Sequence, residues 1–168
     1  LFPYTTLFRS HVHQSKTGWQ ERLEARIGAY ASGVGEIGLD YALDRQTHAL
    51  QNAAMIAQLR LARKFKRPVS IHCRKAWGAL TTILRQEGGL PDGGLIHAYG
   101  GSSDIAKELE MLGAYLSFGA ALTRPGNKRA KAAVASVSSD RLLIETDSPD
   151  MIPYGLKADF NEPAHIGR

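Results

Sequence analysis

Short apolar runs alternate with longer amphipathic segments along this chain. Five runs rich in Val, Ile and Leu predict buried strands at residues 33–36, 68–72, 94–97, 114–118 and 142–147. Between them, apolar residues recur at helical spacing, which predicts helices at residues 45–66, 74–86, 102–112 and 128–137. Strands that alternate with helices are typical of βα units with right-handed crossovers on a parallel sheet.

The length of the chain narrows the choice of architecture. The chain has 168 residues, of which 43% are hydrophobic, so it can form one substantial core. A complete eight-stranded barrel typically needs about 250 residues. The pattern therefore predicts an α/β fold that is either an open doubly wound sheet or an incomplete, TIM-barrel-like (β/α) barrel.

Four of the predicted strands end at or next to a residue that can bind a metal ion. These residues are Glu36, His72, His97 and Asp147. Parallel barrels build their active sites at the carboxyl ends of the strands, and carboxylates and imidazoles are common metal ligands there. A single histidine at a strand end is more often a packed core residue, so the interpretation depends on the whole group. The pattern indicates a metal-dependent hydrolase.

Four motifs resemble those of a known family. They read GEIGLD at residues 35–40, SIHCRKA at 70–76, IHAYGGS at 96–102 and LLIETDSP at 142–149. In order and spacing they resemble the successive motifs of the TatD family of metal-dependent deoxyribonucleases, over about residues 18–166. The resemblance implies a metal-dependent hydrolase barrel, one or two divalent ions (Mg, Mn or Zn) and hydrolysis of phosphodiester bonds in DNA.

The resemblance also implies roles for the residues at the strand ends. Glu36, His72, His97 and Asp147 would be the metal ligands, and Glu36 would bridge two ions. Asp147 would also accept a proton from the attacking water. Arg74 is the second candidate catalytic residue, since a guanidinium can neutralise charge on a transferring phosphate. The alternative for Arg74 is an exposed arginine at the start of a helix.

Two further carboxylates are expected to support the site. Asp40 closes the loop after Glu36, and Asp commonly hydrogen-bonds nearby backbone in such turns. Glu145 lies two positions before Asp147, so it would share a face with Asp147 on a strand that extends to residue 147. Glu145 is therefore expected to point into the barrel as a supporting carboxylate.

Both ends of the chain depart from the pattern of the family it resembles. That family begins with a strand ending in a His-x-His pair, and no such strand opens this chain. His11 and His13 have that spacing, but too few residues separate them from Glu36, so His13 is interpreted as part of a later turn. Residues 161–166 resemble the opening of the last substrate loop. The chain is therefore expected to be a fragment that lacks the first strand and the C-terminal end and is inactive by itself.

The first ten residues need a separate interpretation. Residues 1–10 resemble the translation of a sequencing-library adapter more than a protein segment. They lack the basic region and the sustained apolar region of a signal peptide. Residues 11–168 are interpreted as a partial TatD-like hydrolase domain.

Charge and cysteine content bear on partners and compartment. The formal net charge of +5 suits an anionic partner such as DNA. A basic cluster at the end of one predicted helix is interpreted as a solvated face, because the helix dipole favours basic residues there. The cluster consists of Arg60, Arg63, Lys64, Lys66 and Arg67. The single cysteine, Cys73, and the lack of a run long enough to span a membrane predict a cytoplasmic protein with no membrane partner.

Three functions compatible with this pattern differ in class. The favoured one is a metal-dependent deoxyribonuclease. The second is an amidohydrolase or lactonase of the same barrel superfamily, which would commonly show a metal-bridging Lys or the His-x-His pair. The third is a non-catalytic fragment that keeps only affinity for metal or nucleic acid.

Overall fold

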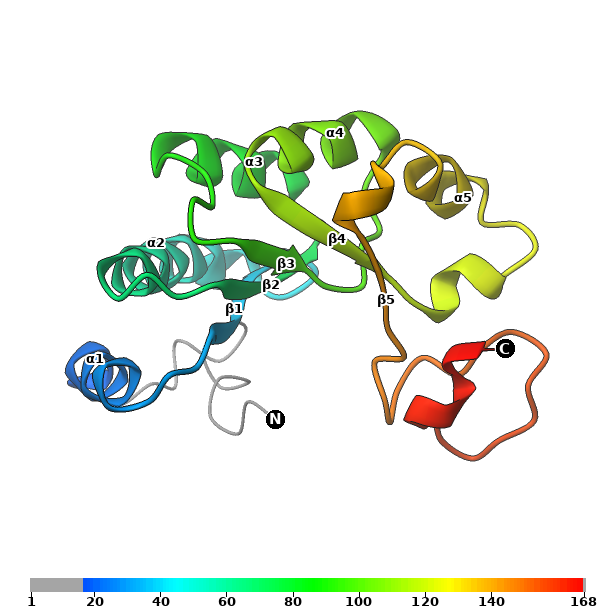
Figure 1. The fold of residues 1–168 in the computed structure, drawn as a ribbon, viewed down its shortest axis with the longest axis horizontal. Coiled ribbons are helices and arrows are strands. Elements are labelled where there is room, and N and C mark those ends of the chain that lie inside the picture. The colour runs from blue at the N-terminus through cyan, green and yellow to red at the C-terminus, as the bar shows by residue number, and fades with distance from the viewer. Residues whose placement is uncertain (1–16, 168) are drawn as a thin grey trace. The chain divides into compact units, whose positions relative to one another are not determined.

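The structure is a computed structural model, and it describes residues 17–167. Helices and strands alternate along these residues as the sequence predicts (Figure 1). The strands follow the order of the chain in the sheet, β1-β2-β3-β4-β5. The chain divides into two compact units, Leu1–Leu95 and Ile96–Arg168, and each unit has its own helices and strands.

The first unit holds two paired parallel strands and three helices. Its elements are α1 (Trp19–Ala29), β1 (Val34–Asp40), α2 (His48–Lys64), β2 (Val69–Arg74) and α3 (Trp77–Gln86), with β3 (Gly94–Ile96) at the boundary. A short 3-10 turn, Arg45–Thr47, precedes α2. In the β1–β2 pair, Gly38 lies opposite His72 and Asp40 lies opposite Arg74. This register aligns the segments of β1 and β2 that carry the candidate site residues of the first unit.

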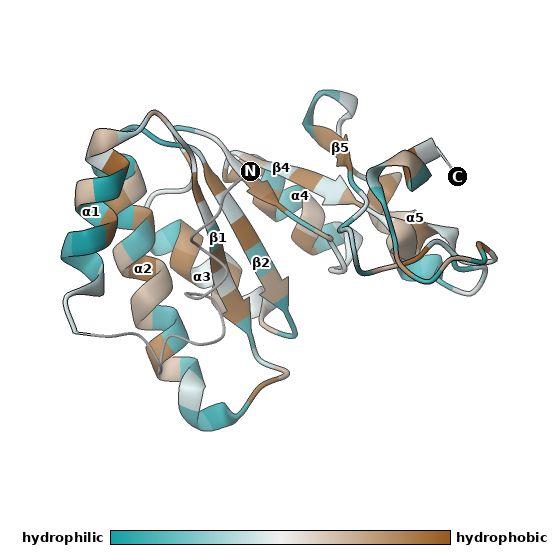
Figure 2. Cartoon of the chain, turned by 90° about the horizontal axis from the view of Figure 1, so that it is seen from below, coloured by the Kyte–Doolittle hydropathy of each residue, from teal (hydrophilic) through white to brown (hydrophobic). Residues whose placement is uncertain are grey.

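The core of the first unit is built from both strands and the helices next to them in the chain. Ile37, Leu39 and Ile71 are completely buried. Figure 2 shows hydrophobic residues alternating with less hydrophobic ones along β1 and β2. The buried amide of Gln51 on α2 accepts a hydrogen bond from the backbone N–H of Asp40 and donates one to its carbonyl. This pair of bonds anchors the carboxyl end of β1 to α2.

The second unit repeats the pattern with shorter elements. It contains α4 (Ser103–Met111), β4 (Ala114–Phe118), α5 (Lys128–Val134) and β5 (Leu142–Ile144), with 3-10 turns at Ala120–Thr123, Ser139–Arg141 and Pro163–Gly167. The strands β4 and β5 are parallel, and Leu116 lies opposite Leu142. The side chain of Ser102 accepts a hydrogen bond from the Ile105 N–H and so begins α4.

The structure differs from the predicted boundaries in three places. The strand predicted at residues 33–36 continues to Asp40, so Glu36 lies inside β1 and not at its end. The strand predicted at 142–147 stops at Ile144, which leaves Glu145 and Asp147 in the next loop. Helix α1 was not predicted, although Trp19, Leu23 and Ile27 recur at helical spacing along it and Ile27 is buried.

The prediction that the strand at residues 142–147 is buried on both faces is wrong. Leu143 is 41% exposed and Ile144 is 65% exposed. The strand β5 is last in the sheet order, so among the described residues it has a neighbour on one edge only. Apolar residues in an edge strand stay partly exposed when nothing packs against them.

No helix among residues 17–167 combines the length and the hydrophobicity needed to cross a bilayer.

Candidate active site

In the first unit, an imidazole lies between two carboxylates. His72 Nδ1 lies 3.3 Å from Glu36 Oε1, and His72 Nε2 lies 3.7 Å from Asp40 Oδ2. Gly38 and Asp40 of β1 alternate onto one face, after a register shift between Val34 and Ile37, and Gly38 lies opposite His72. A Cβ atom at Gly38 would lie 2.0 Å from the carbonyl oxygen of His72. Glycine therefore permits the close approach of the strands that brings His72 to both carboxylates.

Asp40 has two structural roles in addition to its contact with His72. Its Oδ1 atom accepts a hydrogen bond from the Ala42 N–H at 3.0 Å, which closes the turn after β1 as expected for an Asp in this place. Its backbone is held by Gln51 on both sides. These bonds fix the position of the Asp40 carboxylate beside the imidazole of His72.

Arg74 and Cys73 follow His72 on β2 and differ sharply in exposure. The Arg74 side chain is 64% exposed, and its Nη1 atom lies 3.9 Å from Asp40 Oδ2. Its guanidinium is thus reachable from solvent. Cys73 is buried, as expected for a small packed residue, and burial raises the pKa of its thiol to about 12.

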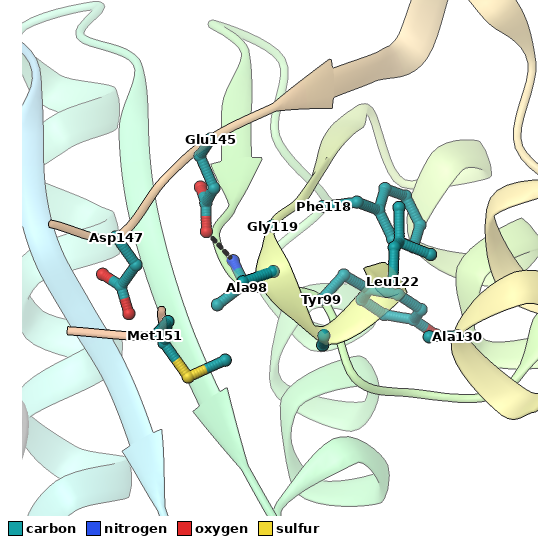
Figure 3. A pocket seen from close by; sticks show the side chains of 11 residues that line it. Ala98, Tyr99, Phe118, Gly119, Leu122, Ala130, Glu145, Asp147 and Met151 are labelled. Carbon is teal, nitrogen blue, oxygen red and sulfur yellow. Dashed lines mark hydrogen bonds between the residues drawn. The ribbon is translucent and has the colours of Figure 1, made fainter. Parts of the chain in front are cut away.

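In the second unit, Glu145 lies against a histidine and a backbone N–H. His97 Nδ1 lies 3.6 Å from Glu145 Oε1, and the Ala98 N–H donates to the same oxygen at 2.5 Å (Figure 3). Burial by itself raises the pKa of the Glu145 carboxyl. Hydrogen bonds from His97, Ser117 and the Ala98 N–H outweigh burial and lower that pKa below its usual value. Glu145 is therefore an anion that orients the His97 ring.

Asp147 lies in the loop after β5, three residues beyond the end of the strand. Its backbone has a φ of 56°, in the left-handed region. Asp147 and Glu145 line one small hollow together with Tyr99, Phe118 and Met151 (Figure 3). The expectation that Glu145 and Asp147 share a strand face is therefore wrong, since the loop and not a strand positions both carboxylates.

Three polar residues that sequence reasoning missed are buried beside these groups: Gln51, Ser117 and Asn161. Ser117 is the one polar residue in the run 114–118 apart from the tyrosine, and that interruption was a signal that it faces something other than the core. Gln51 lies within a helix of ordinary composition, so its role in holding Asp40 could be seen only in three dimensions.

The basic cluster is largely occupied by contacts within the first unit. Arg60 forms an ion pair with Glu87 at 2.7 Å, and Lys64 forms one with Glu24. Arg63 donates to the carbonyl of Gly89 at 3.1 Å. These contacts favour the interpretation of the cluster as a solvated helix end.

Each unit contains donors that suit a hard or borderline divalent ion. Glu36 and Asp147 offer carboxylate oxygens, and His72 and His97 offer imidazole nitrogens. Carboxylates beside ligating imidazoles commonly support such sites; Glu145 lies beside His97, and Asp40 Oδ2 lies 3.7 Å from His72 Nε2. His11, His13 and the segment 1–10 lie outside the described residues.

A family model described as TatD related DNase matches residues 9–168. The chain belongs to the TatD family. It is 36% identical over 148 residues to a Bacillus subtilis protein named uncharacterized metal-dependent hydrolase YabD, covering 88% of this chain and 57% of that one. It is 32% identical to a Cronobacter sakazakii protein named 3'-5' ssDNA/RNA exonuclease TatD, covering 93% of this chain and 63% of that one. The chain thus spans less than two thirds of these relatives.

The fold is also that of TatD proteins. A crystal structure titled YJJV, TatD homolog from Escherichia coli K12, matches with a TM-score of 0.84 and 29% identity. The match covers 91% of this chain and 60% of that one. The prediction of an incomplete TIM-barrel-like hydrolase fold is confirmed, and an open doubly wound sheet is excluded. The family is one of metal-dependent hydrolases.

Proposed function

We propose that this chain carries the catalytic residues of a divalent-metal-dependent nuclease that hydrolyses phosphodiester bonds of DNA. The observation that carries the proposal is that each candidate histidine lies against a carboxylate, His72 beside Glu36 and His97 beside Glu145, in a chain of the TatD family. The name of the Cronobacter sakazakii relative, a single-stranded DNA and RNA exonuclease, supports nucleic acid as the substrate.

The proposed metal ligands are Glu36, His72, His97 and Asp147, for one or two ions of Mg, Mn or Zn. Ions held there would supply Lewis acidity toward a phosphate oxygen and lower the pKa of a water molecule. An imidazole that donates one N–H to a carboxylate presents its other nitrogen as a ligand. Glu145 Oε1 lies 3.6 Å from Nδ1 of His97, where it can orient the ring in this way.

The remaining roles belong to groups that meet the substrate. Asp147 is proposed to accept the proton of the attacking water, because it is a carboxylate in the lining of the hollow beside Glu145. Arg74 is proposed to contact the phosphate, because its guanidinium is exposed and its ion pair with Asp40 is long. Asp40 is proposed to orient His72.

We also propose that the protein is cytoplasmic and that residues 11–168 form a single partial hydrolase domain.

The test needs a protein that spans the length of the relatives. We define the completed protein as this chain joined to the segments of Bacillus subtilis YabD that it does not match. With Mg²⁺ or Mn²⁺, the completed protein should shorten a labelled single-stranded DNA oligonucleotide, and a chelator should stop the reaction. The 168-residue chain, assayed beside it, should show no appreciable hydrolysis.

The same assay separates the alternative functions. Preferential hydrolysis of a lactone or an amide substrate would replace the nuclease with the amidohydrolase or lactonase interpretation. A completed protein that binds metal and hydrolyses none of these substrates would support a non-catalytic binding function. The rate on an RNA oligonucleotide of the same sequence, compared with the rate on DNA, measures the preference for deoxyribose or ribose.

A further inference from the structure

Asn161 is a buried amide whose contacts surround the segment that carries Asp147. Only 2% of the residue is exposed. Its Nδ2 atom donates to the carbonyl of Thr146 at 2.5 Å and to the carbonyl of Met151 at 3.2 Å. Its backbone N–H donates to the carbonyl of Pro149 at 2.8 Å. One residue thus binds the chain immediately before Asp147 and at two points after it.

The loop held in this way has an unusual backbone. Asp147 and Met151 have φ values of 56° and 58°, in the left-handed region that residues other than glycine rarely adopt. The Asp150 N–H donates to the Asp147 carbonyl at 3.0 Å and closes a tight turn between them. Such a conformation persists only where the surroundings determine it, and Asn161 supplies three of the bonds that do so.

The geometry requires an amide at position 161. Two carbonyl oxygens face Nδ2 and need donors, whereas the Glu162 N–H faces Oδ1 at 3.0 Å and needs an acceptor. His165 Nδ1 lies 3.0 Å from the same Oδ1 atom. An aspartate would set a carboxylate oxygen against two carbonyls, and a leucine would remove the donor that bonds to both of them.

We propose that Asn161 is a positioning residue that holds the loop of Asp147 in its left-handed conformation and so sets the place of the Asp147 carboxylate. The inference rests on the proposed role of Asp147 in hydrolysis. It assigns a function to the segment 161–166, which the sequence relates only to a substrate loop.

The direct test is hydrogen exchange in the 168-residue chain. Asn161→Leu and Asn161→Asp should speed exchange of the Asp150 amide at least roughly tenfold, while amides of β4 keep their rates. Gln58→Met is the matched control, because it removes another buried amide, one that donates to the Ala54 carbonyl. The control should leave exchange of the Asp150 amide unchanged.

The inference is overturned if both Asn161 variants leave that exchange rate unchanged, or if Gln58→Met raises it equally. A second measurement needs no variant: in the unmodified chain the amides of Asp150 and Asn161 should be protected from exchange. Free exchange at both would refute the inference even if the Asn161 variants do not fold.

Turnover in the completed protein separates this inference from the proposed function. Asn161→Asp should lower kcat for DNA at least roughly tenfold with KM little changed, because Asp147 is displaced and the substrate contacts remain. If Asp147→Asn leaves hydrolysis intact, the catalytic role proposed for Asp147 fails, whereas the exchange result for the Asn161 variants still decides whether Asn161 holds the loop. An unchanged kcat in Asn161→Asp, with Asp147 shown to be essential, would overturn the positioning role.

Discussion

At the residue scale, the candidate site residues include two histidines, each of which lies beside a carboxylate. His97 lies against Glu145, whose pKa is lowered, so that this carboxylate accepts a hydrogen bond as an anion. His72 lies beside Glu36 and Asp40, at 3.3 and 3.7 Å. One carboxylate beside each ring can orient it while the other donors remain for a metal.

Asp147→Asn should abolish DNA hydrolysis by the completed protein with little change in its thermal stability. The amide cannot act as a base and is a poorer metal ligand, so a loss of roughly 10²-fold or more in kcat is expected. Asp150→Asn, in the same loop and with the same change of charge, is the control and should retain turnover. Retained turnover in Asp147→Asn with metal present would remove Asp147 from the mechanism.

Cys73 should be inert in the folded chain. Burial raises the pKa of its thiol to about 12, so the reactive thiolate is scarce at a pH of about 8 and grows only as the pH approaches 12. A thiol reagent such as DTNB should label the native chain slowly and the guanidinium-unfolded chain at once. Rapid, complete labelling of the native chain at that mildly alkaline pH would show that the thiol is accessible.

At the scale of elements, the pairing of β1 with β2 decides the geometry of the first half of the site. The pair places Gly38 opposite His72, and the backbones approach closely where glycine has no side chain. In the second unit, the loop after β5 positions Glu145 and Asp147, since β5 ends before Glu145. The candidate residues of the first unit are therefore positioned by strand pairing, and those of the second unit by loop hydrogen bonds.

Gly38→Ala should destabilise the chain by about 3 kcal/mol or more, because its Cβ would meet the His72 carbonyl and its φ of 131° is strained for alanine. Gly78→Ala is the matched control. Gly78 lies in α3, and no side chain among residues 17–167 comes within 4 Å of the point that a Cβ would occupy there. Alanine at this position should therefore stabilise the chain by roughly 0.5–1 kcal/mol. Urea unfolding measures both, and equal effects of the two substitutions would contradict the close-approach argument.

At the scale of the whole molecule, metal binding should couple to stability. An ion that binds only the folded state, at a concentration about 100 times its Kd, stabilises by about 2.7 kcal/mol. For a protein of this size, that corresponds to a rise in Tm of roughly 5–10 °C. Addition of Mn²⁺ to the completed protein should produce such a shift in differential scanning fluorimetry.

The shift should depend on the proposed ligands. Glu36→Gln should remove most of it, while Glu110→Gln should keep it, because Glu110 bonds to Ser138 in a different part of the chain. An equal shift in both variants would place the metal elsewhere.

The sequence by itself determined the alternation of elements, the family and the identity of the candidate ligands. Hydrophobic periodicity located five strands and four of the helices, because each buries an apolar face that leaves a repeating signal. It missed α1, although Trp19, Leu23 and Ile27 recur there at helical spacing. The convergence of Glu36, His72, His97 and Asp147 on a metal stays a prediction.

Only the tertiary structure decided where β5 stops and which polar groups hold the candidate site residues. Leu142 to Asp147 is a continuous strand-like run, yet the ladder ends at Ile144, and hydrogen bonds from Asn161 shape the loop beyond it. Gln51 and Ser117 hold Asp40 and Glu145 from other elements. Their roles depend on partners that are distant in the sequence. A local pattern of hydrophobic and polar residues does not show which distant groups come into contact in the folded chain.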